Sequence, residues 1–189
     1  EAAGDHARFS ALVRTTLLEN LSLAARSVDI SLSPPVTEIA GRMIDAANIR
    51  ALSRALAFGV AREDAGRHLI PEGGFELTGE RFEHARRAGS LPDLVQALAG
   101  TQYETYLSRY PEAVRDEDIP VLEAALDQCM LDSVRAASNQ YHLESGPLLR
   151  YLVALGYEVQ NMLAIVGGVA ASLPPEGIER VLVVEKIQE

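Results

Sequence analysis

The residue types that most often bind metals or act as nucleophiles are few and scattered in this sequence. No two histidines stand at the i, i+4 spacing, with a glutamate beside one of them, that a zinc-binding helix requires; the four are His6, His68, His84 and His142. The single cysteine, Cys129, lies in an apolar run, which is typical of a buried side chain rather than of a nucleophile. The sequence therefore predicts no metal site and no cofactor.

Acidic side chains offer the remaining route to catalysis. Asp45 and Glu158 could act as paired carboxylates, one protonated and one ionised, but no nucleophile or oxyanion donor accompanies them. Glu83 and His84 could form an acid–base pair, yet the run RFEHARR is typical of an exposed helix face. Phosphate-binding loops and the hydrolase nucleophile elbow do not occur in the sequence. We expect no catalytic residue; an enzyme would need a pocket that joins Asp45 or Glu158 to a titratable partner.

The composition is that of a soluble globular protein. The 189 residues are 48% hydrophobic, and 17 basic against 27 acidic residues give a formal net charge of −10. This balance argues against nucleic acid as a partner, because phosphate backbones attract cationic surfaces. The longest apolar run, residues 162–173, is shorter than the roughly 20 residues that cross a bilayer, and residues 1–10 lack the features of a secretory signal. One cysteine cannot form an internal disulfide, which favours a reducing, cytosolic compartment.

Apolar residues recur at spacings of three and four almost throughout, so the predicted fold class is all-α with antiparallel helical neighbours. We expect a break at residues 31–35, a second helix that starts near Pro35 and stops at Gly59, an N-cap at Ser90, and a proline, Pro111, that ends a series of short helices. The predicted helices span residues 5–26, 35–58, 63–69, 79–88, 92–99, 103–109, 121–138, 147–171 and 176–184.

An internal repeat organises the chain. Displacing the sequence by 113 residues aligns residues 7–70 with 120–183 without a gap, so that Asn48 falls on Asn161 and Asp45 on Glu158. We therefore predict two helical repeats, in residues 1–110 and 111–189. An acid three residues before an asparagine shares its helix face, and we interpret each pair as a buried polar clamp that fixes helix register. Direct contact with a partner protein is the alternative.

Two adjacent glycines, Gly167 and Gly168, lie inside the predicted helix 147–171, where they reduce helix propensity. The expected compensation is a close crossing with another helix. The aligned residues in the first repeat are Arg54 and Ala55, so this crossing should differ between the repeats.

Four segments resemble a known family. Residues 45–52, DAANIRAL, resemble the D-x-x-N-L/I-x-x-L signature of the C (or d) subunit of V-type and A-type ATPases, and residues 69–74, LIPEGG, are similar to its L-I-P-G-G turn. Its L-x-x-T-x-Y-x-x-x-L element is similar to the set Leu98, Thr101, Tyr103 and Leu107. Residues 158–162, EVQNM, resemble its second E-x-x-N-I copy. With the four segments in family order, the chain is identified as a member of this family.

The resemblance implies an all-helical protein of three related domains, of which roughly the N-terminal third would be missing here. It implies a non-catalytic, peripheral subunit at the cytoplasmic face of the membrane, with no membrane span and no small-molecule substrate. The implied partners are the central-stalk subunits and the proteolipid ring, and the implied role is to couple ATP turnover to proton or sodium transport. A free-standing helical-repeat adaptor that binds a protein partner is the alternative.

Two sets of residues follow from this interpretation. The expected protein interface comprises Arg50, Arg54, Gly73 and Gly74. The residues expected to hold the fold are Asp45, Asn48, Glu158, Asn161, Thr101 and Tyr103. The basic residue usual after the signature asparagine is kept as Arg50 but replaced by Leu163 in the second repeat, which argues against a charge-based contact shared by both copies.

Overall fold

The computed structural model describes residues 2–28 and 33–184, and within them every regular element is an α-helix. The predicted all-α fold class is confirmed. The chain forms two compact units, Glu1–Thr101 and Gln102–Glu189. α6 (Gln102–Leu107) packs on α8 (Ile119–Gln140) of the second unit. The division into helical repeats at residues 1–110 and 111–189 stays a prediction.

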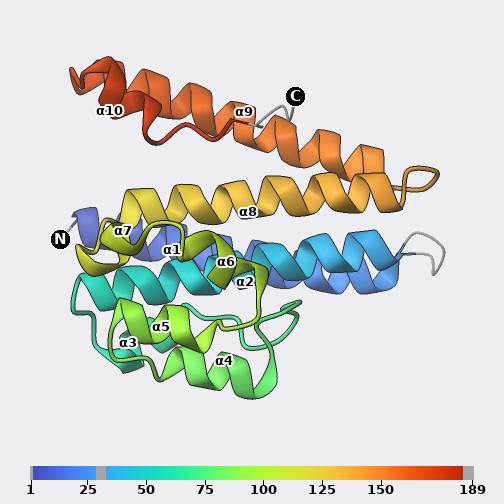
Figure 1. Ribbon diagram of the computed structural model, residues 1–189, viewed down its shortest axis with the longest axis horizontal. Helices are drawn as coiled ribbons and strands as arrows, with labels where there is room; N and C mark the ends of the chain where they lie inside the picture. Colours follow the sequence, from blue (N-terminus) through green and yellow to red (C-terminus); the bar gives the residue numbers. More distant parts are fainter. Residues whose placement is uncertain (1, 29–32, 185–189) are drawn as a thin grey trace. The chain divides into compact units, whose positions relative to one another are not determined.

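The first unit is built on a pair of long helices. α1 (Ala2–Ser27) and α2 (Ser33–Ala57) lie side by side, and three short helices follow them (Figure 1). These are α3 (Arg62–Gly66), α4 (Gly79–Arg86) and α5 (Leu91–Ala97), of which α3 and α5 contact α2 while α4 contacts α5. A buried cluster of Leu18, Ile44 and Ile70 joins α1, α2 and the segment after α3. α2 is therefore the central helix of this unit.

The second unit is arranged around α8. α6, α7 (Pro111–Arg115) and α9 (Gly146–Ala170) all pack on α8, and α10 (Pro175–Glu179) folds back on α9 (Figure 1). The phenol of Tyr106 on α6 donates a 2.6 Å hydrogen bond to Asp132 of α8, and Tyr157 of α9 donates one of 2.9 Å to Asp127 of α8. Two tyrosine–aspartate bonds thus join neighbouring helices to α8.

Most predicted helices match the structure within a few residues, and Ser90 caps α5 by accepting a hydrogen bond from the Asp93 amide, as expected. The prediction for Pro111 was wrong: this proline begins α7, because proline is tolerated in the first turn of a helix. Of the expected break at 31–35, residues 31 and 32 lie outside the described residues, whereas 33–35 already belong to α2.

The two helices that end earliest relative to prediction are α3 and α10. Sequence analysis extended them to residues 69 and 184, but they end at Gly66 and Glu179. A residue beyond each helix end, Ile70 after α3 and Val183 after α10, gives its backbone N–H and C=O groups to an asparagine side chain.

Candidate interaction site

Asn48 holds the segment that follows α3 against α2. Its amide nitrogen donates a hydrogen bond of 2.8 Å to the carbonyl oxygen of Ile70, and its amide oxygen accepts one of 2.8 Å from the Ile70 amide. Both residues are buried, so both backbone groups of Ile70 depend on one side chain for partners. We call this two-bond contact the asparagine clamp.

Asn161 makes the same contact in the second unit. Its side chain donates to the carbonyl oxygen of Val183 at 2.8 Å and accepts from the Val183 amide at 2.9 Å. Both clamps join residues 22 apart in the sequence. The bounds of α9 and α10 are also those of α2 and α3 displaced by 113 residues, the displacement of the proposed repeat.

Asp45 organises the turn that follows the clamp in the first unit. Its carboxylate is fully buried and accepts hydrogen bonds from the amides of Phe75, Glu76 and Leu77, the shortest being 2.7 Å from Glu76. Gly74 lies against it: a Cβ at this position would meet the Asp45 carboxylate and come within 2.8 Å of the Leu77 carbonyl oxygen. The turn therefore requires glycine where it passes the carboxylate.

The other expected interface glycine, Gly73, is equally confined. Its φ of +89° favours glycine, and a Cβ there would crowd Ser22 and Ile44. Contacts within the chain are sufficient to explain why both positions are glycine, without a partner protein. Their role in an interface stays a prediction.

Sequence analysis did not single out Arg42, which links α2 to the same turn. Its guanidinium group donates to Glu38 at 2.9 Å and to Glu76 at 2.6 Å, and it lies 4.4 Å from the centre of the Phe75 ring. Arg42 is only 6% exposed although it is charged. Two carboxylates compensate for its burial. Glu38 is its i−4 neighbour on α2, whereas Glu76 lies 34 residues away, a partner that no local pattern reveals.

Glu158 does not repeat the role of Asp45 among the described residues. Its side chain is exposed, and residues 188 and 189, which align with Phe75 and Glu76, lie outside the described residues. The surrounding face of α9 differs likewise from that of α2. Ile49 is fully buried, whereas the aligned Met162 is 57% exposed. α9 thus presents apolar side chains that α2 buries.

The two remaining fold residues lie at the division between the units. Thr101 is buried and its hydroxyl donates a 2.7 Å hydrogen bond to the carbonyl oxygen of Leu98 at the end of α5. Tyr103 on α6 is 1% exposed. Both therefore have packing or hydrogen-bonding roles within the chain.

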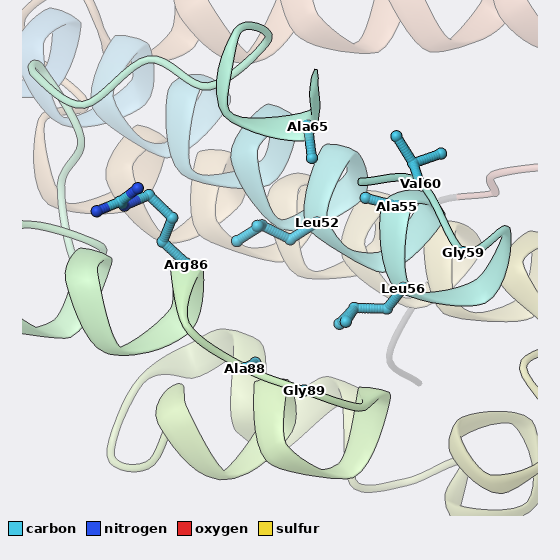
Figure 2. A pocket seen from close by; sticks show the side chains of 9 residues that line it. All are labelled: Leu52, Ala55, Leu56, Gly59, Val60, Ala65, Arg86, Ala88 and Gly89. Atoms are coloured by element: carbon cyan, nitrogen blue, oxygen red, sulfur yellow. The ribbon is translucent and has the colours of Figure 1, made fainter. Parts of the chain in front are cut away.

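The expected interface residues Arg50 and Arg54 come together at a groove between α1, α2 and α3. The groove has a volume of about 400 Å³ and a mostly apolar lining. We call it the Arg50 groove; its lining is Thr15, Leu18, Ala47, Arg50, Ala51, Arg54, Ala55, Phe58, Val60, Ala65, His68 and Ile70. A smaller hollow adjoins it, and Figure 2 shows its lining by Leu52, Leu56 and Arg86 together with the shared residues Ala55, Val60 and Ala65.

Catalytic chemistry finds little support in the described residues. They contain no group of three or more histidine, cysteine, aspartate or glutamate side chains placed to hold a metal ion. Glu83 pairs with Arg86 at 2.7 Å, and this hydrogen bond lowers the pKa of the Glu83 carboxyl, which keeps it ionised rather than ready to exchange protons. Asp45 is engaged with backbone amides and Glu158 lies on another unit.

Comparison with known proteins identifies the family. The profile of the ATP synthase (C/AC39) subunit family matches residues 2–181. The chain belongs to this family. Its relatives include the C subunit of the A-type ATP synthase of Methanocaldococcus jannaschii, 27% identical over 77% of this chain and 37% of that protein, and that of Methanococcoides burtonii, 31% identical over 75% of this chain and 39% of that protein.

A third relative of this C/AC39-family chain is the C subunit of the A-type ATP synthase of Pyrococcus abyssi, 28% identical over 77% of the chain and 39% of that protein. The chain therefore spans less than two fifths of the length of these curated relatives. No solved structure gives a significant match.

One described helix of this C/AC39-family chain, α9, is long and apolar enough to cross a membrane by length and composition. The uninterrupted apolar run, residues 162–173, covers only part of this helix. Length and composition do not distinguish a membrane span from a helix that packs against other protein. Asn161 within α9 bonds the Val183 backbone, a contact made by the equivalent Asn48 in the first unit.

Proposed function

We propose that this chain is part of a non-catalytic subunit that connects the central stalk of a V/A-type rotary ATPase to the proteolipid ring. The membership of the ATP synthase (C/AC39) subunit family carries this proposal. The subunit would lie at the cytoplasmic face of the membrane, held there by the ring rather than by a span of its own. It would transmit torque between ATP turnover and the transport of protons or sodium.

The arrangement of the helices suits this role. A part that transmits torque must resist deformation, and in both units the segment after a short helix is fixed to a long helix by two hydrogen bonds from a single side chain. In the first unit the buried Asp45 carboxylate fixes the next turn by three further amides. Such closed polar contacts favour one packing of the helices over alternatives.

The test is purification of the tagged product of the whole gene from gently solubilised membranes of its own source, with mass spectrometry of the chains that accompany it. The proposal expects stalk subunits and proteolipid in a fixed ratio to one copy of this chain. Recovery with other soluble proteins, and without proteolipid, would refute it and favour the helical-repeat adaptor.

A functional assay checks the coupling role. Membrane vesicles that lack this subunit should retain little ATP-driven ion uptake, and the purified whole product should restore it. Soluble ATPase activity of the detached head should not change on addition of the subunit. Restored hydrolysis by an isolated head would instead point to a catalytic contribution.

A further inference from the structure

The Arg50 groove has a floor that is already part of the hydrophobic core. Leu18 and Ile70 belong to the buried cluster with Ile44, and Ala47 packs against it. Small alanines along α2 and α3 leave the space above this floor unfilled. The groove is therefore a hollow over a fixed apolar surface, and an aliphatic side chain placed there would lose water without displacing the core.

The second unit packs differently at the aligned positions. Ala55 of α2 aligns with Gly168, and Ala65 of α3 aligns with Ile178. Ile178 packs directly on Gly168: a Cβ at Gly168 would lie 2.6 Å from the Ile178 Cγ1. The second unit thus pairs a branched aliphatic side chain with a glycine, whereas the first unit has two alanines and an open groove.

The charges around the groove also differ between the units. Arg50, Arg54 and His68 line the groove, and among its described lining residues none is acidic. Their aligned residues are Leu163, Gly167 and Val181, so the second unit has no basic residue at these positions. The Arg50 groove therefore has basic lining residues, although the net charge of the chain is −10.

Arg50 and Arg54 both interact within the chain. A guanidinium group has five N–H donors, so each arginine can donate hydrogen bonds to a carboxylate in addition to its internal partner. The exposed ring of Phe58, 73% exposed at the edge of the groove, adds apolar surface beside these donors.

We propose that the Arg50 groove is a docking site for a partner protein of the rotary complex, which inserts a leucine-, isoleucine- or valine-sized side chain and places one or two carboxylates against Arg50 and Arg54. The inference rests on the proposed function and specifies its interface. The aliphatic side chain takes the open space above Leu18 and Ile70. The carboxylates complement the basic residues that line the groove, Arg50, Arg54 and His68.

The first test fills the groove from within. The double substitution Ala55→Gly and Ala65→Ile reproduces the pair Gly168 and Ile178 in the first unit and leaves the arginines in place. In the tagged whole gene product, it should reduce recovery of stalk subunits at least tenfold, with thermal unfolding within a few degrees of the wild type. Ala51→Leu fills the same groove from α2 and replaces the double variant should that one fail to fold.

The second test removes the charge. Arg50→Leu together with Arg54→Gln should weaken recovery of the stalk subunits, and the remaining binding should depend less on salt. Arg87→Gln is the matched control, since Arg87 is an exposed arginine of the same unit outside the groove. Equal losses in both variants would refute a specific role for the groove.

A photoreactive residue at position 68 identifies the occupant. The proposal expects cross-linking to one partner peptide that carries an aliphatic residue and an acidic residue within one helical turn. Cross-linking to a lipid, or to a peptide without a carboxylate, overturns it. If the wild type recovers no ATPase subunit, the proposed function fails; if wild type and filled variant recover the same subunits equally, only the docking site fails.

Discussion

The asparagine clamps lead to a quantitative prediction, because the same contact occurs in two environments. Substituting Asn48→Ala leaves the amide and the carbonyl of Ile70 without partners in a buried site, at roughly 1 to 3 kcal/mol each. We expect a loss of about 2 to 6 kcal/mol in the free energy of unfolding of the first unit. Asn161 is half-buried, so water can replace its bonds in part. Asn161→Ala should cost only about 1 to 2 kcal/mol.

Hydrogen exchange read by mass spectrometry is the appropriate assay, since the chain has two compact units that can unfold separately. Peptides that contain Ile70 report the first clamp and peptides that contain Val183 report the second. A loss of 2 kcal/mol raises exchange of the affected amide about 30-fold. Gln160→Ala, an exposed substitution beside Asn161, is the control and should alter neither peptide measurably.

Two outcomes would refute this reasoning. If Asn48→Ala altered exchange no more than Gln160→Ala, the hydrogen bonds would not carry the stability assigned to them. If Asn161→Ala cost more than Asn48→Ala, burial would not be what distinguishes the two clamps. Either result would remove the energetic argument for a rigid unit.

Three further predictions rest on other contacts. Gly167→Ala, where a Cβ meets nothing within 4 Å, should raise the melting temperature through a gain of up to about 1 kcal/mol, whereas Gly168→Ala should lower it because Ile178 occupies the space. Ile49→Ala should cost about 2 to 5 kcal/mol in urea unfolding and Met162→Ala about 1 or less, since the first is fully buried and the second 57% exposed. Burial and the bond to Asp132 raise the pKa of Tyr106 to about 12. The neutral phenol therefore stabilises the fold below pH 10, and this contribution is lost as the pH rises to 12. Tyr106→Phe should remove the pH dependence of the free energy of unfolding in this range.

Local patterns in the sequence were sufficient for the long helices and for the positions of the clamps, but not for α7 or for the ends of α3 and α10. Apolar periodicity predicts the long helices, and the 113-residue displacement pairs Asn48 with Asn161 before any contact is known. The same reasoning anticipated that the glycine pair in α9 marks a close approach, and the structure shows it at Gly168 but not at Gly167. What each motif residue binds was beyond reach, because the partners are backbone groups 22 to 32 residues away.

The Arg50 groove was harder still to predict, because an unfilled volume arises from side chains that are small and leaves no positive signal in a sequence. The sequence suggests Arg50 and Arg54 as interface residues because they lie outside the repeated motif positions; the structure adds the apolar floor beside them. The signal that could have found the floor is the pair of alanines, Ala55 and Ala65, aligned with a glycine and an isoleucine. Such a pair indicates a difference in packing only when both of its positions are compared between the two units.

The differences between the two units therefore bear more on function than their similarities. Positions that both units share, such as Asn48 and Asn161, complete contacts within the chain and would be needed in any assembly. Positions that differ, such as Arg50 and its aligned Leu163, are where surroundings outside the chain can act differently on the two units. In the first unit Ala55 and Ala65 are both small, and the space above Leu18 and Ile70 stays unfilled. The open hollow beside Arg50 is thus a cost to the isolated unit, and a partner side chain seated there would compensate for it.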